Sequence, residues 1–141
     1  MKLKGQCHCG NLSLEFEATV PVAELPLRAC QCSFCRSHAA LSTSDPKGSV
    51  SVLARDAALV QRYRFGLGIT DFLICRRCGV YLLAMMDMDG HPYAVINANV
   101  LERRDEMTST PQPMDYDGED AGSRLARRKG RWTPVVALQG L

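Results

Sequence analysis

Cys30-Gln31-Cys32-Ser33-Phe34-Cys35 places three cysteines within six residues, and Arg36 follows directly. Thiolates this close in sequence can face one soft or borderline metal ion, and zinc is the usual ion for such a set. Three thiolates leave one position of a tetrahedral ion free for another ligand. The spacing therefore predicts a zinc site with an open position, and we expect the chemistry of the protein at this position.

The other four cysteines form two pairs, Cys7-His8-Cys9 and Cys75-Arg76-Arg77-Cys78, and a glycine follows each pair. Glycine allows the tight turn that lets two nearby thiolates face one ion. Structural zinc is nearly always four-coordinate, whereas catalytic zinc keeps three protein ligands. Seven cysteines therefore suit one closed site of four and one open site of three.

Spacing alone leaves two divisions of the cysteines open. A zinc-ribbon arrangement would combine Cys32 and Cys35 with Cys75 and Cys78, and would leave the other three cysteines over. The alternative combines the two glycine-terminated pairs and keeps the triplet intact. We favour this second division, because a contiguous triplet surrounds one ion with little loss of loop entropy. His38 lies three residues after Cys35 and could complete the triplet as a fourth ligand, which would close it.

Length and composition are typical of one small domain without a membrane span. The chain has 141 residues, a hydrophobic content of 46% and a net charge of +2. An odd number of cysteines and an amino-terminal segment without an apolar core favour reduced thiols and a cytoplasmic location. The longest apolar run, residues 80–86, is too short to span a bilayer. The small net charge does not favour nucleic-acid binding.

Hydrophobic alternation predicts a mostly β body. Leu12, Leu14 and Phe16 alternate with polar residues in the pattern of a half-buried strand. The predicted strands cover residues 11–17, 49–53, 59–65, 69–74, 80–86 and 92–98. The last two form a predicted hairpin across Asp89-Gly90, a dipeptide that suits positive φ. The small and polar residues 37–48 predict a long loop over the triplet.

After Leu101 the alternating apolar pattern gives way to charged residues and then to a segment with two prolines. We therefore expect a zinc-binding domain over residues 1–101 and a carboxy-terminal extension, residues 102–141, that packs on the domain or is partly mobile. Acidic residues 115–120 precede a predicted short helix that runs to Lys129, and the final apolar segment is expected to dock on the body. The basic residues near Lys129 are expected to form a solvated helix end, because the acidic stretch counters their charge.

Four motifs resemble, in order and spacing, the glutathione-dependent formaldehyde-activating enzyme family, which also contains centromere protein V. They are Gly5-Gln6-Cys7-His8-Cys9-Gly10, the triplet with Arg36, Tyr63-Arg64-Phe65-Gly66 and Cys75-Arg76-Arg77-Cys78-Gly79. The resemblance covers residues 4–101 and implies the β-tent fold. This is an all-β arrangement of short antiparallel strands stapled by zinc, here with a short helical or irregular carboxy-terminal tail.

The resemblance also implies two zinc ions and their ligands. A structural zinc would be held by Cys7, Cys9, Cys75 and Cys78, and a catalytic zinc by Cys30, Cys32 and Cys35. The implied activity is that of a carbon–sulfur lyase like S-(hydroxymethyl)glutathione synthase, which condenses glutathione or a similar small thiol with formaldehyde or a related small aldehyde.

The chemistry of three thiolates agrees with such a reaction. An ion that already holds three thiolates is a poor Lewis acid for a carbonyl, but it can bind a fourth thiol and lower the pKa of that thiol. Arg36, next to the triplet, is expected to contact a carboxylate of the thiol substrate. The alternative function is a non-catalytic structural zinc module that acts in protein or nucleic-acid interaction.

Overall fold

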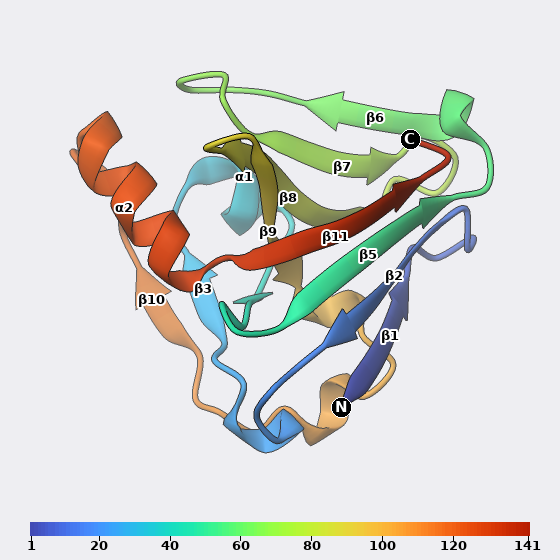
Figure 1. The fold of residues 1–141 in the computed structure, drawn as a ribbon, viewed down its shortest axis with the longest axis horizontal. Coiled ribbons are helices and arrows are strands. Elements are labelled where there is room, and N and C mark those ends of the chain that lie inside the picture. Colours follow the sequence, from blue (N-terminus) through green and yellow to red (C-terminus); the bar gives the residue numbers. More distant parts are fainter.

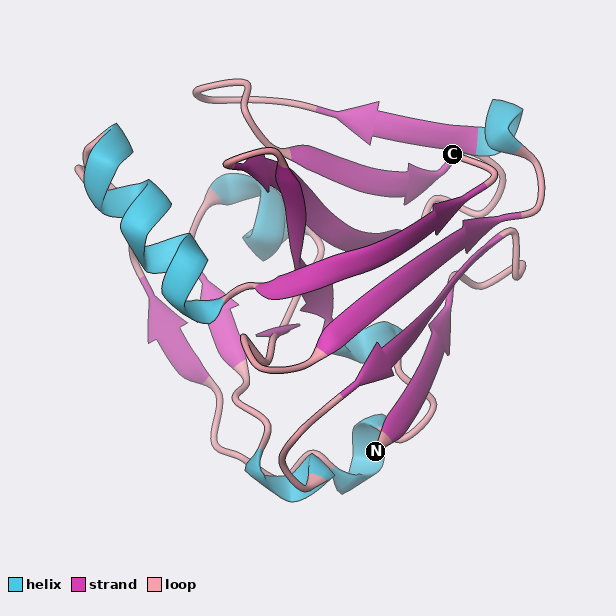
Figure 2. Ribbon diagram, viewed as in Figure 1, coloured by secondary structure: helices cyan, strands magenta, loops and turns pink.

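A computed structural model describes residues 1–141 and consists mainly of strands (Figures 1 and 2). The strands are β1 (Lys2–Gln6), β2 (Leu12–Glu17), β3 (Arg28–Cys30), β4 (Ser42–Thr43), β5 (Ser49–Ala54), β6 (Val60–Tyr63), β7 (Asp71–Cys75), β8 (Tyr81–Met88), β9 (His91–Asn97), β10 (Gln112–Met114) and β11 (Thr133–Gln139). The helices are α1 (Ser33–Ser37) and α2 (Ala121–Arg131), with 3-10 turns at Val22–Glu24, Ala57–Leu59, Ala98–Val100 and Arg104–Glu106. The predicted all-β class is confirmed, and no helix has the length and apolar character that a membrane crossing requires.

Strand β11 joins two groups of strands into one mixed sheet. On one side, β11 runs parallel to β5, and the antiparallel strands β2 and β1 follow (Figure 1). Its first two residues instead pair with β9 in the antiparallel sense, and a bulge lies between Val135 and Ala137. From β9 the sheet continues through β8, β7 and β6, and separately through β4, β3 and β10. The sheet thus extends past Leu101, because β10 and β11 both pair with strands from the first part of the chain.

The core follows the alternation seen in the sequence. Leu12, Leu14 and Phe16 are buried on one face of β2, while Glu15 and Glu17 are exposed on the other. They belong to a main core of 23 buried residues between the sheet and its connections. Fully burying one such side chain stabilises a fold by about 1.5–3 kcal/mol, so alternation of this kind fixes which face of each strand turns inward.

The predicted hairpin between β8 and β9 is confirmed. Asp89 and Gly90 form its turn with φ values of 54° and 81°. Two successive residues with positive φ match the twist of the flanking strands, and glycine accepts this conformation without steric cost.

Residues 37–48, predicted as a long loop over the triplet, are mostly irregular but include one short strand and several buried residues. Ser42 and Thr43 form β4, which pairs with β3 and β9. The buried Asp45 carboxylate accepts hydrogen bonds from the Thr19 N–H at 2.6 Å, the Thr19 hydroxyl at 2.7 Å and the Lys47 N–H at 3.0 Å. Burial opposes ionisation, but these hydrogen bonds outweigh it and lower the pKa of Asp45. The small polar residues of this segment are therefore tied into the body.

The predicted carboxy-terminal helix is present as α2. It begins after Asp120, whose carboxylate accepts a hydrogen bond from the Ser123 N–H at 2.7 Å. It ends at Arg131, two residues beyond the predicted Lys129. Figure 1 shows α2 at the same end of the molecule as β3 and β10, so the helix lies near the strand that leads into the cysteine triplet.

Candidate metal centres and the adjoining cavity

Cys7, Cys9, Cys75 and Cys78 form a four-cysteine cluster whose sulfur atoms all lie within 4.8 Å of one another. The Cys9 sulfur is 3.7 Å from that of Cys7 and 3.5 Å from that of Cys75. Four thiolates around one zinc ion have sulfur atoms about 3.8 Å apart, given Zn–S bonds of about 2.3 Å and tetrahedral angles. A disulfide would bring two sulfurs to about 2.05 Å. The arrangement therefore fits one tetrahedral ion.

Two matching turns build the four-cysteine cluster. In each turn the glycine N–H donates to the carbonyl of the first cysteine, at 3.1 Å for Gly10 and 2.8 Å for Gly79. These glycines have φ values of 83° and 81°, so both need the conformational freedom that the sequence suggested. A backbone N–H also donates to the first sulfur of each turn, at 3.3 Å for Cys7 and 3.5 Å for Cys75. The sulfurs are held in place by the backbone itself.

Burial and mutual contact shift the pKa values of the four-cysteine cluster in opposite directions. Burial, together with the neighbouring thiols, raises the pKa of Cys7 to about 11. Burial also opposes ionisation of Cys78, but backbone N–H groups and neighbouring thiols lower its pKa to about 6. A divalent cation resolves this conflict, because it replaces the thiol protons and lets all four sulfurs be thiolates.

Cys30, Cys32 and Cys35 form a three-cysteine cluster at the junction of β3 and α1, and their sulfurs also lie within 4.8 Å of one another. Cys32 caps α1, and its sulfur accepts a hydrogen bond from the Cys35 N–H at 3.4 Å. A hydrogen bond with the Cys35 thiol lowers the pKa of Cys30 to about 6 against the effect of burial, and the same contact raises that of Cys35. The set fits one soft or borderline ion with three protein ligands.

The structure groups the cysteines as four and three and keeps the triplet intact. It does not bring Cys32 and Cys35 together with Cys75 and Cys78 in one cluster, as a zinc ribbon would. His38 belongs to neither cluster. Its Nδ1 lies 3.0 Å from the Phe34 carbonyl oxygen, and its ring packs on Phe34 with centroids 4.4 Å apart. His8 is exposed and also lies outside the clusters. The cluster therefore offers three protein donors, one fewer than a tetrahedral ion takes.

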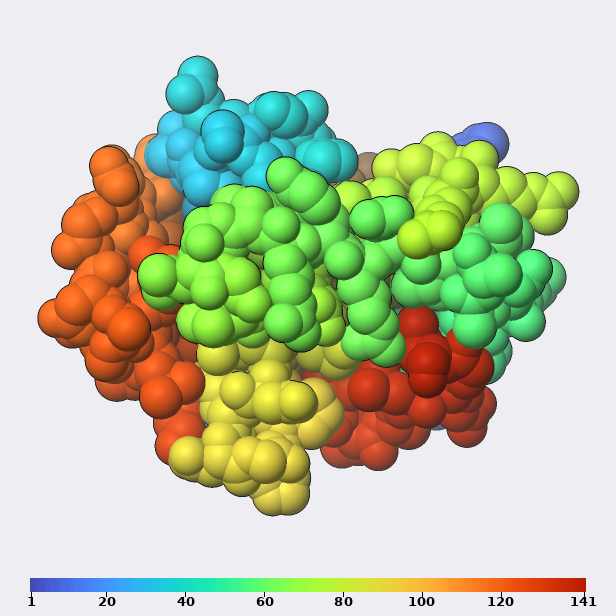
Figure 3. Space-filling model, turned by 90° about the horizontal axis from the view of Figure 1, so that it is seen from above, coloured from blue at the N-terminus to red at the C-terminus, as the bar shows by residue number.

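A cavity of about 500 Å³ adjoins the three-cysteine cluster. Its apolar lining residues are Phe65, Leu67, Ile69, Phe72, Tyr81, Ala84, Val95 and Trp132. Seen from above, the β6–β7 hairpin (green) lies between the segment around α1 (cyan) and the β8–β9 turn (yellow), with α2 (orange) at one side (Figure 3). The volume is within the range of small-molecule sites. None of the four-cysteine cluster lines this cavity, so only the triplet faces a ligand-sized space.

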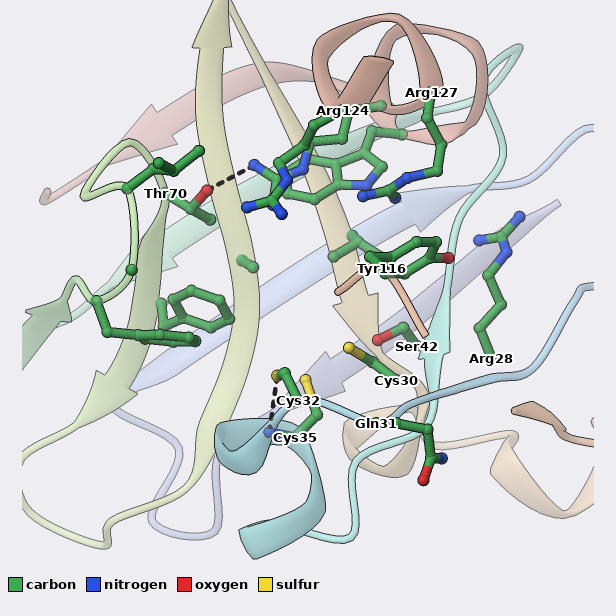
Figure 4. Close-up of a pocket in the computed structure, with 18 of the residues that line it drawn as sticks. Arg28, Cys30, Gln31, Cys32, Cys35, Ser42, Thr70, Tyr116, Arg124 and Arg127 are labelled. Carbon is green, nitrogen blue, oxygen red and sulfur yellow. Dashed lines mark hydrogen bonds between the residues drawn. The ribbon is translucent and has the colours of Figure 1, made fainter. Parts of the chain in front are cut away.

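Five arginines line the same cavity: Arg28 from β3, and Arg124, Arg127, Arg128 and Arg131 from α2 and its end. In Figure 4, Arg124 and Arg127 lie across the cavity from Cys30 and Cys32, with Tyr116 between them. The Arg127 guanidinium lies over the Tyr116 ring, 3.5 Å from its centroid. The cavity therefore has a sulfur-lined end and a cationic end.

These arginines correct the expectation that the basic end of the helix is solvated. The Arg128 Nη1 donates to the Thr70 hydroxyl at 2.7 Å, and its guanidinium lies 4.5 Å from the Trp132 ring centroid. Burial lowers the pKa of Arg128 to about 10. The sequence does hold a signal for this face, because residues 124, 127, 128 and 131 repeat at the spacing of one side of a helix.

Arg36, the expected substrate-binding residue, does not line the cavity. It lies exposed on α1, one residue after the buried Cys35. Adjacent residues on a helix point in different directions, so the turn that directs Cys35 inward turns Arg36 outward. The structure thus brings the seven cysteines together in two sets but leaves Arg36 outside both the cavity and the clusters.

Comparison with known proteins links this site to one family. A family model described as glutathione-dependent formaldehyde-activating enzyme matches residues 2–115, which include all seven cysteines. Among solved structures, the crystal structure of a Rhodobacter sphaeroides protein is similar, with 29% sequence identity and a TM-score of 0.58. That similarity covers 77% of this chain and 98% of the other chain. A search of curated proteins found no match.

Proposed function

The chain belongs to the glutathione-dependent formaldehyde-activating enzyme family, and from this premise we propose that it is a zinc-dependent carbon–sulfur lyase. The reaction adds the thiol of glutathione to formaldehyde, or to a related small aldehyde, and gives S-(hydroxymethyl)glutathione or its analogue. The observation that carries the proposal is the position of the three-cysteine cluster at one end of a ligand-sized cavity.

The two clusters would each hold one zinc ion with a different task. Cys7, Cys9, Cys75 and Cys78 supply a complete tetrahedral set away from the cavity, which suits a structural ion. Cys30, Cys32 and Cys35 supply three ligands beside the cavity, which suits a catalytic ion. As part of the same proposal, the sheet is a β-tent. The protein would act in the cytoplasm, where its seven free cysteines stay reduced.

Zinc bound at the three-cysteine cluster would lower the pKa of an incoming thiol, so that the reactive thiolate forms at neutral pH. The chain itself supplies proximity. The apolar walls of Phe65, Phe72 and Trp132 exclude water and confine the thiol and the aldehyde to the same space.

The addition also needs a proton at the aldehyde oxygen. As the carbon–sulfur bond forms, the carbon–oxygen double bond becomes single, and the oxygen takes a proton while the thiol gives one up. Ser42 and Tyr81 place hydroxyl-bearing side chains in the cavity lining. Burial raises the pKa of Tyr81 well above its usual value, so this phenol stays protonated and can donate a hydrogen bond to the developing oxyanion.

Cobalt substitution followed by glutathione titration tests the proposal. In the cobalt-loaded wild-type protein, we expect glutathione to change the thiolate-to-metal and ligand-field bands until the change saturates. In Cys32→Ser the response should disappear, while the bands of the four-cysteine cluster remain. His38→Ala is the matched control, because His38 lies outside both clusters, and it should keep the wild-type response.

An unchanged spectrum at high glutathione concentration, or an unchanged response in Cys32→Ser, would contradict the open-site assignment. Formation of the hydroxymethyl adduct, followed by NMR, tests the reaction itself. We expect Cys32→Ser to lower kcat/KM by about 100-fold or more, because even outer-shell partners of zinc ligands contribute about 10- to 100-fold.

A further inference from the structure

We propose that Arg28, Arg128 and Arg131 form an anion-binding subsite that makes the cavity selective for thiols with a carboxylate at their far end. This inference rests on the proposed function, which places the substrate sulfur at the three-cysteine cluster. The arginines at the other end of the cavity would then bind the negatively charged end of the substrate. The substrate class is then a small acidic thiol.

Charge balance in the cavity is the first argument. Glu119 is the carboxylate that pairs with Arg124 at 3.3 Å and with Arg127 at 2.9 Å and 3.0 Å. No carboxylate oxygen lies within 4.0 Å of a guanidinium nitrogen of Arg28, Arg128 or Arg131, since the ion pairs of the chain involve other residues. Asp115 and Asp117 also line the cavity, but neither forms an ion pair with these three guanidinium groups.

The surroundings of Arg128 are the second argument. Thr70 and the Met86 sulfur accept hydrogen bonds from Nη1 at 2.7 Å and 2.9 Å, while the buried Nε has no hydrogen-bond partner. A buried cation with an unpaired donor is costly unless an opposite charge lies near. No carboxylate pairs directly with Arg128, and Glu119, which pairs with Arg124 and Arg127, acts on it only from a distance. An anion in the cavity would be its direct partner.

Mutual repulsion is the third argument. Arg28 lines the same cavity as Arg127 and Arg131, so like charges face one another there. The Arg28 side chain is held toward this region by a hydrogen bond from its Nη1 to the Ser44 hydroxyl at 2.8 Å. A bound carboxylate would relieve the repulsion and could accept paired hydrogen bonds from a planar guanidinium.

The layout of the cavity defines the ligand. Cys30 and Cys32 lie at one end in Figure 4, Arg28 at the side, and Arg124 and Arg127 of α2 opposite the cysteines. Arg128 and Arg131 line the same cavity. A thiol that binds at the cysteines therefore directs its other end toward the arginines. Arg128 and Arg131 lie beyond residues 2–115, the region that the family model matches, whereas Arg28 lies within it.

The test uses S-methylglutathione, which keeps both carboxylates of glutathione but has no free thiol. Trp132 is the only tryptophan and packs against Arg128 in the cavity wall, so its fluorescence reports binding in the zinc-loaded full chain. We expect a saturable change in fluorescence that weakens with added salt. Affinity should fall at least about tenfold in Arg128→Gln and in Arg28→Gln, because each removes charge-assisted hydrogen bonds.

Two features of this design exclude simple damage to the fold. Arg28 and Arg128 lie on different elements, so a shared loss of affinity does not come from a local change in α2. Lys129→Gln removes the same charge from the same helix, but Lys129 pairs with Asp89 and does not line the cavity. This control should bind S-methylglutathione with the wild-type affinity.

Glutathione diethyl ester separates the subsite from the proposed reaction, because the ester keeps the thiol and loses the carboxylate charges. If the ester changes the cobalt spectrum at the same concentrations as glutathione, or if Arg128→Gln binds S-methylglutathione normally, the anion subsite is wrong and the thiol chemistry stands. If S-methylglutathione binding depends on the arginines while glutathione leaves the cobalt spectrum unchanged, the subsite stands and the proposed reaction fails.

Discussion

The four-cysteine cluster and the three-cysteine cluster use the same donor atoms in opposite settings. In the first, Cys9 and Cys75 are 66 residues apart in sequence, and Cys7 and Cys75 belong to the main core. In the second, all three ligands lie within six residues, at one end of a cavity. One cluster joins distant parts of the chain, whereas the other closes only a short local segment.

The comparison shows how sequence separation and surroundings would give two similar candidate metal sites different roles. Joining distant segments removes more conformational freedom from the unfolded chain than joining near ones, so an ion there stabilises the fold. A local triplet adds little to the topology, and its three ligands leave a position for chemistry.

Cys75→Ser should give the largest effect on stability. Cys75 is fully buried and lies where β7 ends, so the change removes a ligand that joins the two matching turns. We expect the free energy of unfolding of the zinc-loaded protein to fall by more than about 4 kcal/mol, measured by urea denaturation. Cys32→Ser should cost less than about 2 kcal/mol, because the triplet closes only a short loop. Equal losses in the two variants would contradict the comparison.

Asp45→Asn should give the next largest effect, without involving either metal site. Asp45 holds the segment between the triplet and β5 through hydrogen bonds from Thr19 and Lys47. We expect a loss of about 2 kcal/mol in the free energy of unfolding at pH 7, as for other buried hydrogen bonds to a charged group. Asp87→Asn, at an exposed position of β8, is the control and should cost less than about 0.5 kcal/mol.

The pH dependence separates this effect from that of zinc. The pKa of Asp45 is lower in the fold than in the unfolded chain, so its stabilising effect is complete above the unfolded pKa and is lost as the pH falls through the folded value. The gap between wild type and Asp45→Asn should therefore be constant from pH 6 to pH 8. The stability lost in Cys75→Ser should instead grow with pH, because zinc binding releases thiol protons. A gap for Asp45→Asn that also grows with pH would tie this residue to the metal sites.

Zinc release should distinguish the clusters kinetically. A competing chelator can reach the three-cysteine cluster through the cavity, whereas the four-cysteine cluster has its full ligand set. We expect two phases of zinc release that differ in rate by about tenfold or more, with the faster phase absent in Cys32→Ser. A single phase that releases two ions per chain would show that both sites are equally closed.

Strands β2 and β5 to β9 and the cysteine turns were predictable because their signals are local, whereas the other strands were not predicted. The alternation around Leu14, the Asp89-Gly90 turn and the glycines after each cysteine pair all act over a few residues. The pairing of β11 with both β5 and β9 was not predictable, because an apolar segment does not specify its partner strand. Burial of Asp45 depends on Thr19 and Thr133, which lie far from it in sequence.

The arginines show the same limit at the site. The spacing of Arg124, Arg127, Arg128 and Arg131 indicates one helix face, but only the tertiary fold determines whether that face meets solvent or the cavity. Conversely, a residue next to the triplet in sequence does not have to face the cavity. Arg36 follows the triplet directly, yet the first turn of α1 carries it to the surface.

Arg36→Ala should therefore have the smallest effect of all. The side chain is exposed and outside the cavity, so water and salt screen its charge from a bound ligand. We expect the glutathione affinity of the cobalt-loaded protein to change by less than about twofold, and zinc content to stay at the wild-type value. Arg28→Gln, measured in the same titration, provides the contrast, because Arg28 lines the cavity. A tenfold loss in Arg36→Ala would return substrate recognition to α1 and would mean that the triplet and its charge partner are encoded in one continuous stretch of sequence.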